Sequence, residues 1–244
     1  MDRKNVSIVR YQKPRESVRR AVELCGGLDN LPRAPRVFIK PNIVFWFKVL
    51  FPKWGVATTS RVIEDAVVLL KEHGVNDIVI GEGMVLRNYK DSETPADAFE
   101  KLGFGKLRER YGVKSLNIHA RPFIKTDLGG GVILNFNQDA LESDFLVNLP
   151  VLKTHSQTTT SLGIKNLKGL IDVESRKKCH NPDLERDLEY MIARLADKMP
   201  PSLTLIDGIY SLERGPGFDG APRRTDLLVR SEEHTSELQS PNTI

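Results

Sequence analysis

One strand–helix–strand succession constrains the fold of this chain more than any other feature. Residues 36–44 (RVFIKPNIV) form an apolar, β-branched run that stops at a Pro-Asn pair. Residues 58–74 (TTSRVIEDAVVLLKEHG) start with hydroxyl side chains, carry apolar residues at helical spacing and end in glycine. Residues 76–83 (NDIVIGEG) form a second apolar strand. Because the intervening helix is long enough to join parallel strands, we predict a βαβ unit.

The same kind of alternation continues along the chain. Helical patterns cover residues 97–112 and 181–199, and apolar strand patterns cover residues 130–136, 143–150 and 202–209. Apolar strands that alternate with helices are typical of a parallel sheet covered on both faces. We therefore predict an α/β fold, with a single three-layer domain around a mostly parallel sheet.

Charge and cysteine content narrow the classes of partner. The 244 residues carry a formal net charge of +4, which permits an anionic partner but is too low to indicate a nucleic-acid-binding protein. Two cysteines, Cys25 and Cys179, lie too far apart for a disulfide framework and are too few for a four-thiolate cluster. A reducing, cytoplasmic location is predicted.

No segment has the pattern of a membrane span. The chain starts without an apolar stretch of signal-peptide length, and no apolar run approaches 18 residues. The nearest candidate, residues 43–56 (IVFWFKVLFPKWGV), is interrupted by lysines and a proline. We interpret this segment as part of the core or a lid rather than a membrane anchor, and the role of its aromatic part, Phe45 to Trp54, stays open.

The end of the chain differs from the rest. Residues 230–240 (RSEEHTSELQS) have neither helical nor strand periodicity, and they resemble the translation of a sequencing-library adapter. We therefore expect residues 230–244 to be a non-native, disordered tail and residues 1–229 to hold the domain. A natural polar C-terminus is the alternative.

Positive charge gathers at the end of one strand. Residues 148–173 (NLPVLKTHSQTTTSLGIKNLKGLIDV) place Lys153 and His155 directly after an apolar segment. In a helix, Lys165 and Lys168 would lie on one face, three residues apart. Open α/β sheets bind ligands outside the carboxyl ends of their strands, so this pattern indicates an anion site with a histidine for proton transfer or metal binding. A solvated basic loop is the alternative.

Polar residues end other strands as well. Lys40 and Asn42 follow one strand, and Glu82 lies between two glycines after the next. Asp207 precedes a glycine near the end of an apolar strand, where its carboxylate can bind a metal, orient a histidine or start a turn. His180 follows a cysteine before the predicted helix of residues 181–199, but an adjacent Cys-His pair is not a recognised zinc spacing.

The order of these motifs is more specific than any one of them. From about Val37 to Val229 the chain resembles the domain of unknown function 362 family, through VFIKPN, IVIGEG, NLPVLKTH, GIKNLKG, a lone histidine and LIDGI. The resemblance implies a cytoplasmic α/β domain without an agreed reaction. Relatives often add ferredoxin-like modules, and the family domain continues past Val229, so we expect C-terminal elements to be missing here. An iron–sulfur cluster is expected only if that missing sequence supplies cysteines.

Together, the residues and the resemblance predict a site at the carboxyl ends of the strands. Its predicted catalytic residues are His155, Lys153 and His180. Its predicted anion-binding residues are Lys40, Asn42, Lys165, Asn166 and Lys168. A divalent metal, if one binds, is expected at Glu82, His155 and Asp207.

Two functions follow from this pattern. The first is an enzyme, or a metal- or anion-dependent accessory protein, with a pocket for a small anionic molecule and a link to redox metabolism. The alternative is a non-enzymatic scaffold or electron-transfer protein that docks an iron–sulfur redox protein through a basic face. Lysines that converge on one hollow favour the first, and lysines spread over the surface favour the second.

Overall fold

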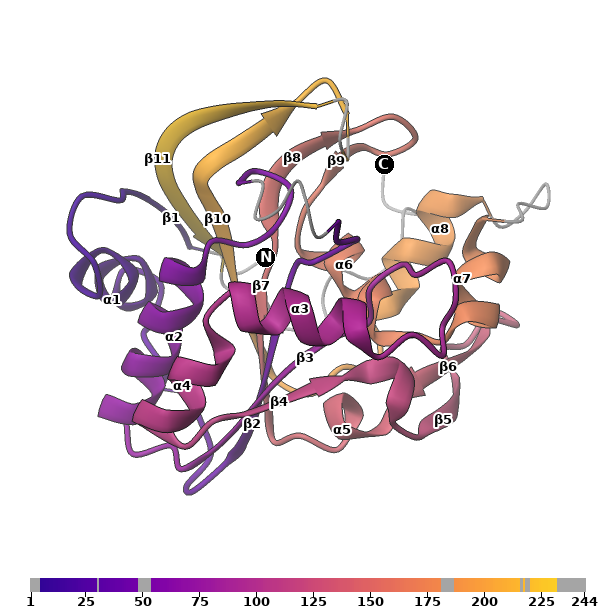
Figure 1. The fold of residues 1–244 in the computed structure, drawn as a ribbon, viewed down its shortest axis with the longest axis horizontal. Helices are drawn as coiled ribbons and strands as arrows, with labels where there is room; N and C mark the ends of the chain where they lie inside the picture. Colours follow the sequence, from indigo (N-terminus) through magenta and orange to yellow (C-terminus); the bar gives the residue numbers. More distant parts are fainter. Residues whose placement is uncertain are drawn as a thin grey trace.

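A computed structural model describes residues 5–29, 31–47, 54–180, 187–215, 217 and 220–231. Within these ranges a nine-stranded sheet runs through the molecule (Figure 1). Its centre is parallel, as predicted, and consists of β10 (Ser202–Glu213), β7 (Phe145–Leu149), β2 (Arg36–Pro41), β3 (Asp77–Glu82) and β4 (Lys114–Asn117) in that order.

Antiparallel strands extend this centre on one side. The order continues from β10 to β11 (Ala221–Ser231) and then to β1 (Val6–Arg10). β8 (Val151–His155) pairs with β10, and the short β9 (Thr159–Ser161) pairs with β8. The last strand thus extends two residues past the boundary predicted at residue 229. Residues 232–244 of the predicted tail lie outside the described residues.

The predicted βαβ unit is confirmed as β2, α2 (Ser60–Glu72) and β3. β2 and β3 pair in parallel with Val37 opposite Ile78. α2 buries its apolar face, including Val62 and Leu70, and the chain turns after it at Gly74, which has φ 79°. A residue without a Cβ adopts this left-handed conformation at little cost.

Two hydrophobic clusters show that the sheet is covered on both faces. Val37 and Ile39 of β2 belong to one cluster, whereas Phe38 between them belongs to the other, because successive strand residues point to opposite faces. The first cluster packs residues of α1 (Glu16–Glu23), α2, α3 (Glu93–Lys101) and α4 (Phe104–Tyr111).

The second cluster lies under the remaining helices and a separate β-hairpin. Its members come from β6 (Ile133–Asn137), α5 (Gln138–Leu141), α7 (Val173–His180) and α8 (Leu188–Ala193), together with the 3₁₀ turns η1 (Ile118–Ala120), η2 (Leu167–Leu170) and η3 (Arg194–Ala196). Residues of β5 (Phe123–Asp127), which pairs with β6, and of α6 (Gly163–Asn166) pack against it. Figure 1 shows α6, α7 and α8 on one side of the molecule and α1, α2 and α4 on the other. The predicted three-layer α/β arrangement is therefore observed.

Three helices differ from their predictions. The helix predicted over residues 97–112 is divided into α3 and α4 at Gly103, which has φ 81° and cannot continue a right-handed helix. The segment with Lys165 and Lys168 is one helical turn, α6, followed by η2. His180 is the last described residue of α7, and of the helix predicted over residues 181–199 the structure describes α8 and η3, with residues 181–186 outside the described ranges.

The aromatic segment contributes to the core where it is described. Trp46 is buried in the first cluster and donates from Nε1 to Oδ2 of Asp97 at 2.6 Å. Residues 48–53 of this segment lie outside the described residues.

Candidate functional site

A cavity of about 450 Å³ opens where the parallel strands end. It brings together nine of the ten residues predicted for the site. They are Lys40, Asn42, Glu82, Lys153, His155, Lys165, Asn166, Lys168 and His180. β2, β3 and β8 run in the same direction, so their carboxyl ends meet at this edge. Five of the nine residues lie on these strand ends or directly after them, namely Lys40, Asn42, Glu82, Lys153 and His155.

Positive charge dominates the lining of the cavity. Its cationic side chains are Lys40, Lys153, Lys165, Lys168, Arg176 and Lys177, and the only carboxylate in the described lining is that of Glu82. Lys177 is already paired with Glu174 at 2.8 Å on the exposed side of α7. The remaining cations therefore share one carboxylate.

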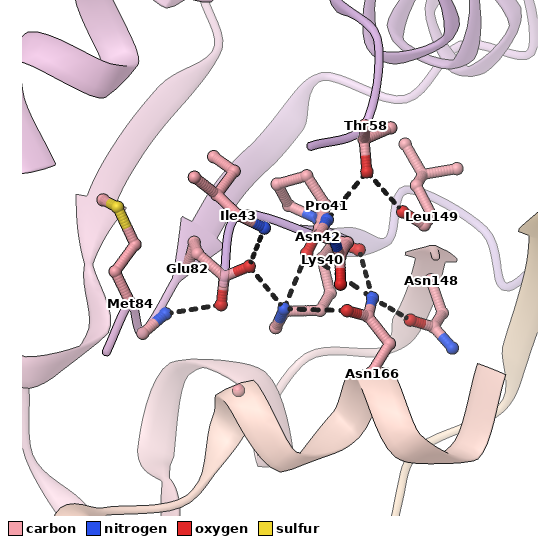
Figure 2. A network of polar contacts seen from close by, with 12 residues as sticks. Lys40, Pro41, Asn42, Ile43, Thr58, Glu82, Met84, Asn148, Leu149 and Asn166 are labelled. Atoms are coloured by element: carbon pink, nitrogen blue, oxygen red, sulfur yellow. Dashed lines mark hydrogen bonds and ion pairs between the residues drawn. The ribbon is translucent and has the colours of Figure 1, made fainter. Parts of the chain in front are cut away.

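Lys40 forms an ion pair with the carboxylate of Glu82. Its side chain is 1% exposed, and Nζ lies 2.8 Å from Oε2 of Glu82 (Figure 2). The same ammonium donates to the carbonyl of Pro41 at 2.6 Å and to Oδ1 of Asn166 at 3.5 Å. Burial lowers the pKa of Lys40, and the neighbouring Glu82 opposes this shift. The pair lies at the ends of two adjacent strands, so it also ties β2 to β3.

Glu82 is held on both of its oxygens. Oε2 also accepts from the backbone N–H of Ile43 at 2.6 Å, and Oε1 accepts from the N–H of Gly83 at 2.8 Å. A buried carboxylate needs such donors, because an unsatisfied charge inside a protein is strongly destabilising. The oxygens of Glu82 are therefore occupied by the protein itself.

Asn166 fastens α6 to the strand ends. Its Nδ2 donates to Oδ1 of Asn148 at 2.8 Å and lies 3.3 Å from the carbonyl of Lys40 (Figure 2). Asn148, on β7, in turn donates from Nδ2 to the carbonyl of Gly163 at 2.9 Å. These bonds place the segment that carries Lys165 and Lys168 against the carboxyl edge of the sheet.

Asn42 orients a second buried lysine. Its Nδ2 donates to the carbonyl of Val56 at 2.7 Å, and its N–H donates to Oγ1 of Thr58 at 2.8 Å. Oδ1 is left to accept from Nζ of Lys153 at 3.1 Å. Lys153 is 4% exposed, and within the described chain it has no carboxylate partner. Burial lowers the pKa of Lys153 to about 7; the charge of Glu82 opposes this shift, and the charges of Lys165 and Lys40 add to it.

Lys165 and Lys168 add two more amines that lack an ion-pair partner among the described residues. Lys165 donates to Oγ1 of Thr158 at 3.3 Å, and Lys168 contacts Nε2 of His180. Partial burial and the charge of Lys168 lower the pKa of Lys165 to about 7. Burial lowers the pKa of Lys168 to about 8. The three amines repel one another as long as nothing negative lies between them.

The two histidines of the cavity are neutral at physiological pH. Burial, followed by the charge of Lys165, lowers the pKa of His155 to about 4. Nδ1 of His155 accepts from the backbone N–H of Gln157 at 3.1 Å, so the proton of the neutral ring lies on Nε2. Burial and Lys168 also lower the pKa of His180.

Two glycines allow the backbone to approach the ion pair closely. A Cβ on Gly169 would lie 2.6 Å from Oε1 of Glu82 and 2.6 Å from Cε of Lys40. A Cβ on Gly83 would lie 2.5 Å from Nη2 of Arg176 and 2.5 Å from the carbonyl of Gly169. Side chains at either position would displace the groups that line the cavity.

Arg176 is a cavity residue that sequence reasoning missed. It is buried on α7 and donates from Nη2 to the carbonyl of Gly169 and from Nε to that of Ile171, both at 3.0 Å. Burial lowers its pKa. Its position could have indicated this role, because Arg176 lies four residues, or about one helical turn, before His180. The sequence, however, does not predict the helix α7 that carries both residues.

Asp207 does not line the cavity. Its carboxylate is buried beside the start of α2, where Oδ2 accepts from the N–H of Thr59 at 2.6 Å and Oδ1 accepts from that of Ile209 at 3.0 Å. Burial raises the pKa of Asp207 to about 6. The predicted metal ligands Glu82, His155 and Asp207 therefore do not converge, and the described residues contain no group of three His, Cys, Asp or Glu that fits a metal ion.

The fold and the cavity define an α/β protein with a lysine-rich hollow at the carboxyl edge of a mostly parallel sheet. The chain belongs to the family described as domain of unknown function (DUF362), whose model matches residues 37–235. The family resemblance is thereby confirmed. No helix in the described ranges is long and apolar enough to cross a membrane.

The proteins similar to this chain include one relative in sequence and one in fold. A thylakoid-associated protein of Synechocystis sp. is 26% identical over 237 residues, which are 93% of this chain and 70% of that protein. The lactate racemase apoprotein of Thermoanaerobacterium thermosaccharolyticum has a similar fold, with a TM-score of 0.54 and 16% identity over 82% of this chain. The chain spans only 49% of the racemase, so this similarity concerns the fold alone.

Proposed function

We propose that the cavity is the site of an enzyme and binds a small organic anion, through a carboxylate or phosphate group. One observation carries this proposal: Lys153, Lys165 and Lys168 line one hollow without a carboxylate partner in the described chain. The only acid in the described lining, Glu82, is already paired with Lys40. A bound anion would supply the missing negative charge.

The energetics and the size of the cavity support a small ligand. Bringing several ammonium groups into a low-dielectric hollow is unfavourable, and here the cost appears as lowered pKa values. An anion among these amines reverses part of the shift, because opposite charge favours the protonated form. A volume of about 450 Å³ is within the range of small-molecule sites, about 300–1,000 Å³.

The comparisons are compatible with a small carboxylate. The racemase with the similar fold is named for lactate, a small organic anion. For this chain a carboxylate ligand rests on the lysines, since the identity is too low to carry a substrate across. A cytoplasmic location and a link to redox metabolism stay predictions.

The geometry gives less support to the docking alternative. Lys40 and Lys153 are buried, so their charges cannot lie on a flat face offered to an iron–sulfur protein. A divalent metal held by Glu82, His155 and Asp207 also loses its basis, because Asp207 lies elsewhere. The small-anion site is therefore the function that the cavity favours.

Calorimetric titration of the full chain with sulfate and with lactate tests the proposal. We expect saturable binding to the wild type, and a loss of about tenfold or more in affinity for Lys165→Met and Lys168→Met, since each removes a charge-assisted hydrogen bond. Lys106→Met, an exposed position on α4, is the matched control and should bind like the wild type. Absence of saturable binding, or equal losses in the control, would overturn the proposal.

A further inference from the structure

We propose that Lys153 is a nucleophile that forms an imine with the carbonyl carbon of a 2-oxo acid, while Lys165 and Lys168 hold the carboxylate of that acid. This inference rests on the proposed anion site and names the chemical class of its ligand. It comes from the contrast between the two buried lysines of the cavity. Lys40 is held by a carboxylate, and Lys153 has only a neutral amide as its partner.

The surroundings of Lys153 leave its amine available for reaction. Lys153 lines the cavity, and within the described residues its Nζ has one hydrogen bond, to Oδ1 of Asn42 at 3.1 Å. Asn42 is itself fixed by its bonds to Val56 and Thr58, so its oxygen cannot turn away. An amide oxygen fixes the position of the amine without stabilising its charged form as a carboxylate would.

An ammonium has no lone pair, so a nucleophilic lysine must lose its proton near neutral pH. Desolvation and a nearby cation are the two devices that achieve this. Lys153 has both, because it is buried and because the charges of Lys165 and Lys40 disfavour its own; Glu82 acts in the opposite sense, so burial is the main cause. With its pKa lowered to about 7, Lys153 can supply a free amine near neutral pH, where an ordinary lysine is almost fully protonated.

The neighbouring groups fit the two ends of a 2-oxo acid. Lys165 and Lys168 lie on the segment that borders the same cavity and lack ion-pair partners in the described chain. A carboxylate held there stabilises their charged forms. The adjacent carbonyl carbon would then face the amine of Lys153, so one small molecule satisfies both kinds of group.

His155 supplies a hydrogen-bond donor on the same side of β8. Lys153 and His155 are two residues apart on this strand, so their side chains extend from the same face, and both line the cavity. Since Nδ1 accepts from Gln157, Nε2 of the neutral ring carries the proton. That N–H can donate to the carbonyl oxygen of the ligand and to the hydroxyl that replaces it.

The proposed step is balanced without a further reactant. The nitrogen lone pair of Lys153 forms the C–N bond while the carbonyl π electrons move to oxygen, and the oxygen takes up the proton that the nitrogen loses. The hydroxyl of this carbinolamine then leaves as water with a second proton, and the C=N bond forms. Overall, amine, 2-oxo acid and one proton from solvent give a protonated imine and one water. No redox change occurs.

Reductive trapping of the full chain tests the inference. The protein is incubated with pyruvate, reduced with sodium borohydride and digested, and the modified lysine is located by mass spectrometry. We expect one stable adduct, on Lys153. Lactate, which has the carboxylate but a hydroxyl in place of the keto group, should give no adduct. Added together with pyruvate, it should lower the yield of the pyruvate adduct by competition. Lys153→Arg should abolish trapping, whereas Lys125→Arg, at an exposed site on β5, should retain it.

The outcomes separate this inference from the proposed function. If sulfate and lactate bind but reduction labels another lysine, or labels exposed lysines without preference, the nucleophile is wrong and the anion site stands. If neither anion binds, the proposed function fails as well. Peptide mapping of the wild type decides the assignment even where Lys153→Arg does not fold.

Discussion

The cavity contains two regions that hold positive charge in different ways. In the paired region, Lys40 lies against Glu82, and Asn166 completes its hydrogen bonds. In the unpaired region, Lys153, Lys165 and Lys168 face the same space, and none of them is paired with a carboxylate in the described chain. The residue type is the same, but its partners differ. The paired region holds strand ends together, and the unpaired region has charge left for a ligand.

This difference separates structural roles from functional ones. A buried ion pair with all its hydrogen bonds made is costly to break, because removal of one partner leaves the other charge unpaired in a low-dielectric interior. Buried amines without counter-ions reduce stability when they are charged, and a protein gains nothing structural from them. Substitutions in the two regions should therefore have different consequences.

The largest effect is expected from Glu82→Gln in the paired region. The change removes the charge opposite Lys40 and weakens the acceptor for Ile43 and Gly83. Loss of one partner from a buried pair typically costs about 3–5 kcal/mol in the free energy of unfolding. Urea unfolding measures this loss. Glu72→Gln, which removes the partner of Arg19 in an exposed pair, should cost far less; equal losses would contradict the distinction between the two settings.

A smaller effect is expected from Gly169→Ala. The added Cβ would lie 2.6 Å from both Oε1 of Glu82 and Cε of Lys40, so the ion pair must shift. Overpacking of this kind costs about 1–3 kcal/mol of unfolding free energy. Gly105→Ala is the matched control on α4, where the new methyl group meets only the side-chain end of Glu100 at 3.3 Å. There the melting temperature should stay the same or rise. An unchanged free energy of unfolding in Gly169→Ala would show that the paired region is not tightly packed.

The most gradual effect, and the smallest for each amine over one pH unit, is expected from pH and belongs to the unpaired region. The pKa values of Lys153 and Lys165 are about 7 in the folded protein, against an ordinary value of 10.5. Between these values the unfolded chain binds more protons, so unfolding free energy rises with pH. The destabilisation is complete below pH 7 and fades towards pH 10.5. The slope for each such amine is at most about 1.4 kcal/mol per pH unit.

Sulfate sharpens the same prediction, because its charge is constant across this pH range. We expect its stabilisation of the fold to be greatest near pH 6 and to decline by pH 9, as the amines lose their protons. Urea unfolding at several pH values, with and without sulfate, measures both trends. Lys153→Met should flatten the rise without sulfate. An unchanged slope in this variant would exclude Lys153 as its source.

The parallel core could be predicted from the sequence because its signals are local. Apolar strands, a helix with the right spacing and a glycine C-cap identify β2, α2 and β3 within 50 residues or so, a length typical of one such unit. The rule that strand ends meet at one edge then brings Lys40, Glu82 and Lys153 together. Asn166 came from the family resemblance alone.

The failures have non-local causes. The sequence predicts Asp207 near a strand end, but β10 continues to Glu213, so this carboxylate lies within the strand and accepts a hydrogen bond at the start of α2. Arg176 was missed because α7 has almost no apolar periodicity and was not recognised as a helix. Neither the length of β10 nor the position of α7 is encoded in a short window, since both depend on packing against distant segments.

The pairing of β1 with β11 has a consequence for how the protein is made. Ile8 lies opposite Val229, so the first strand finds its neighbour only after nearly all of the residues described here have been synthesised. During translation the backbone of β1 stays unpaired with β11 until β11 has been synthesised. Contacts between residues so distant in sequence also slow folding. The amino-terminal strand is therefore the part of this sheet that a growing chain completes last.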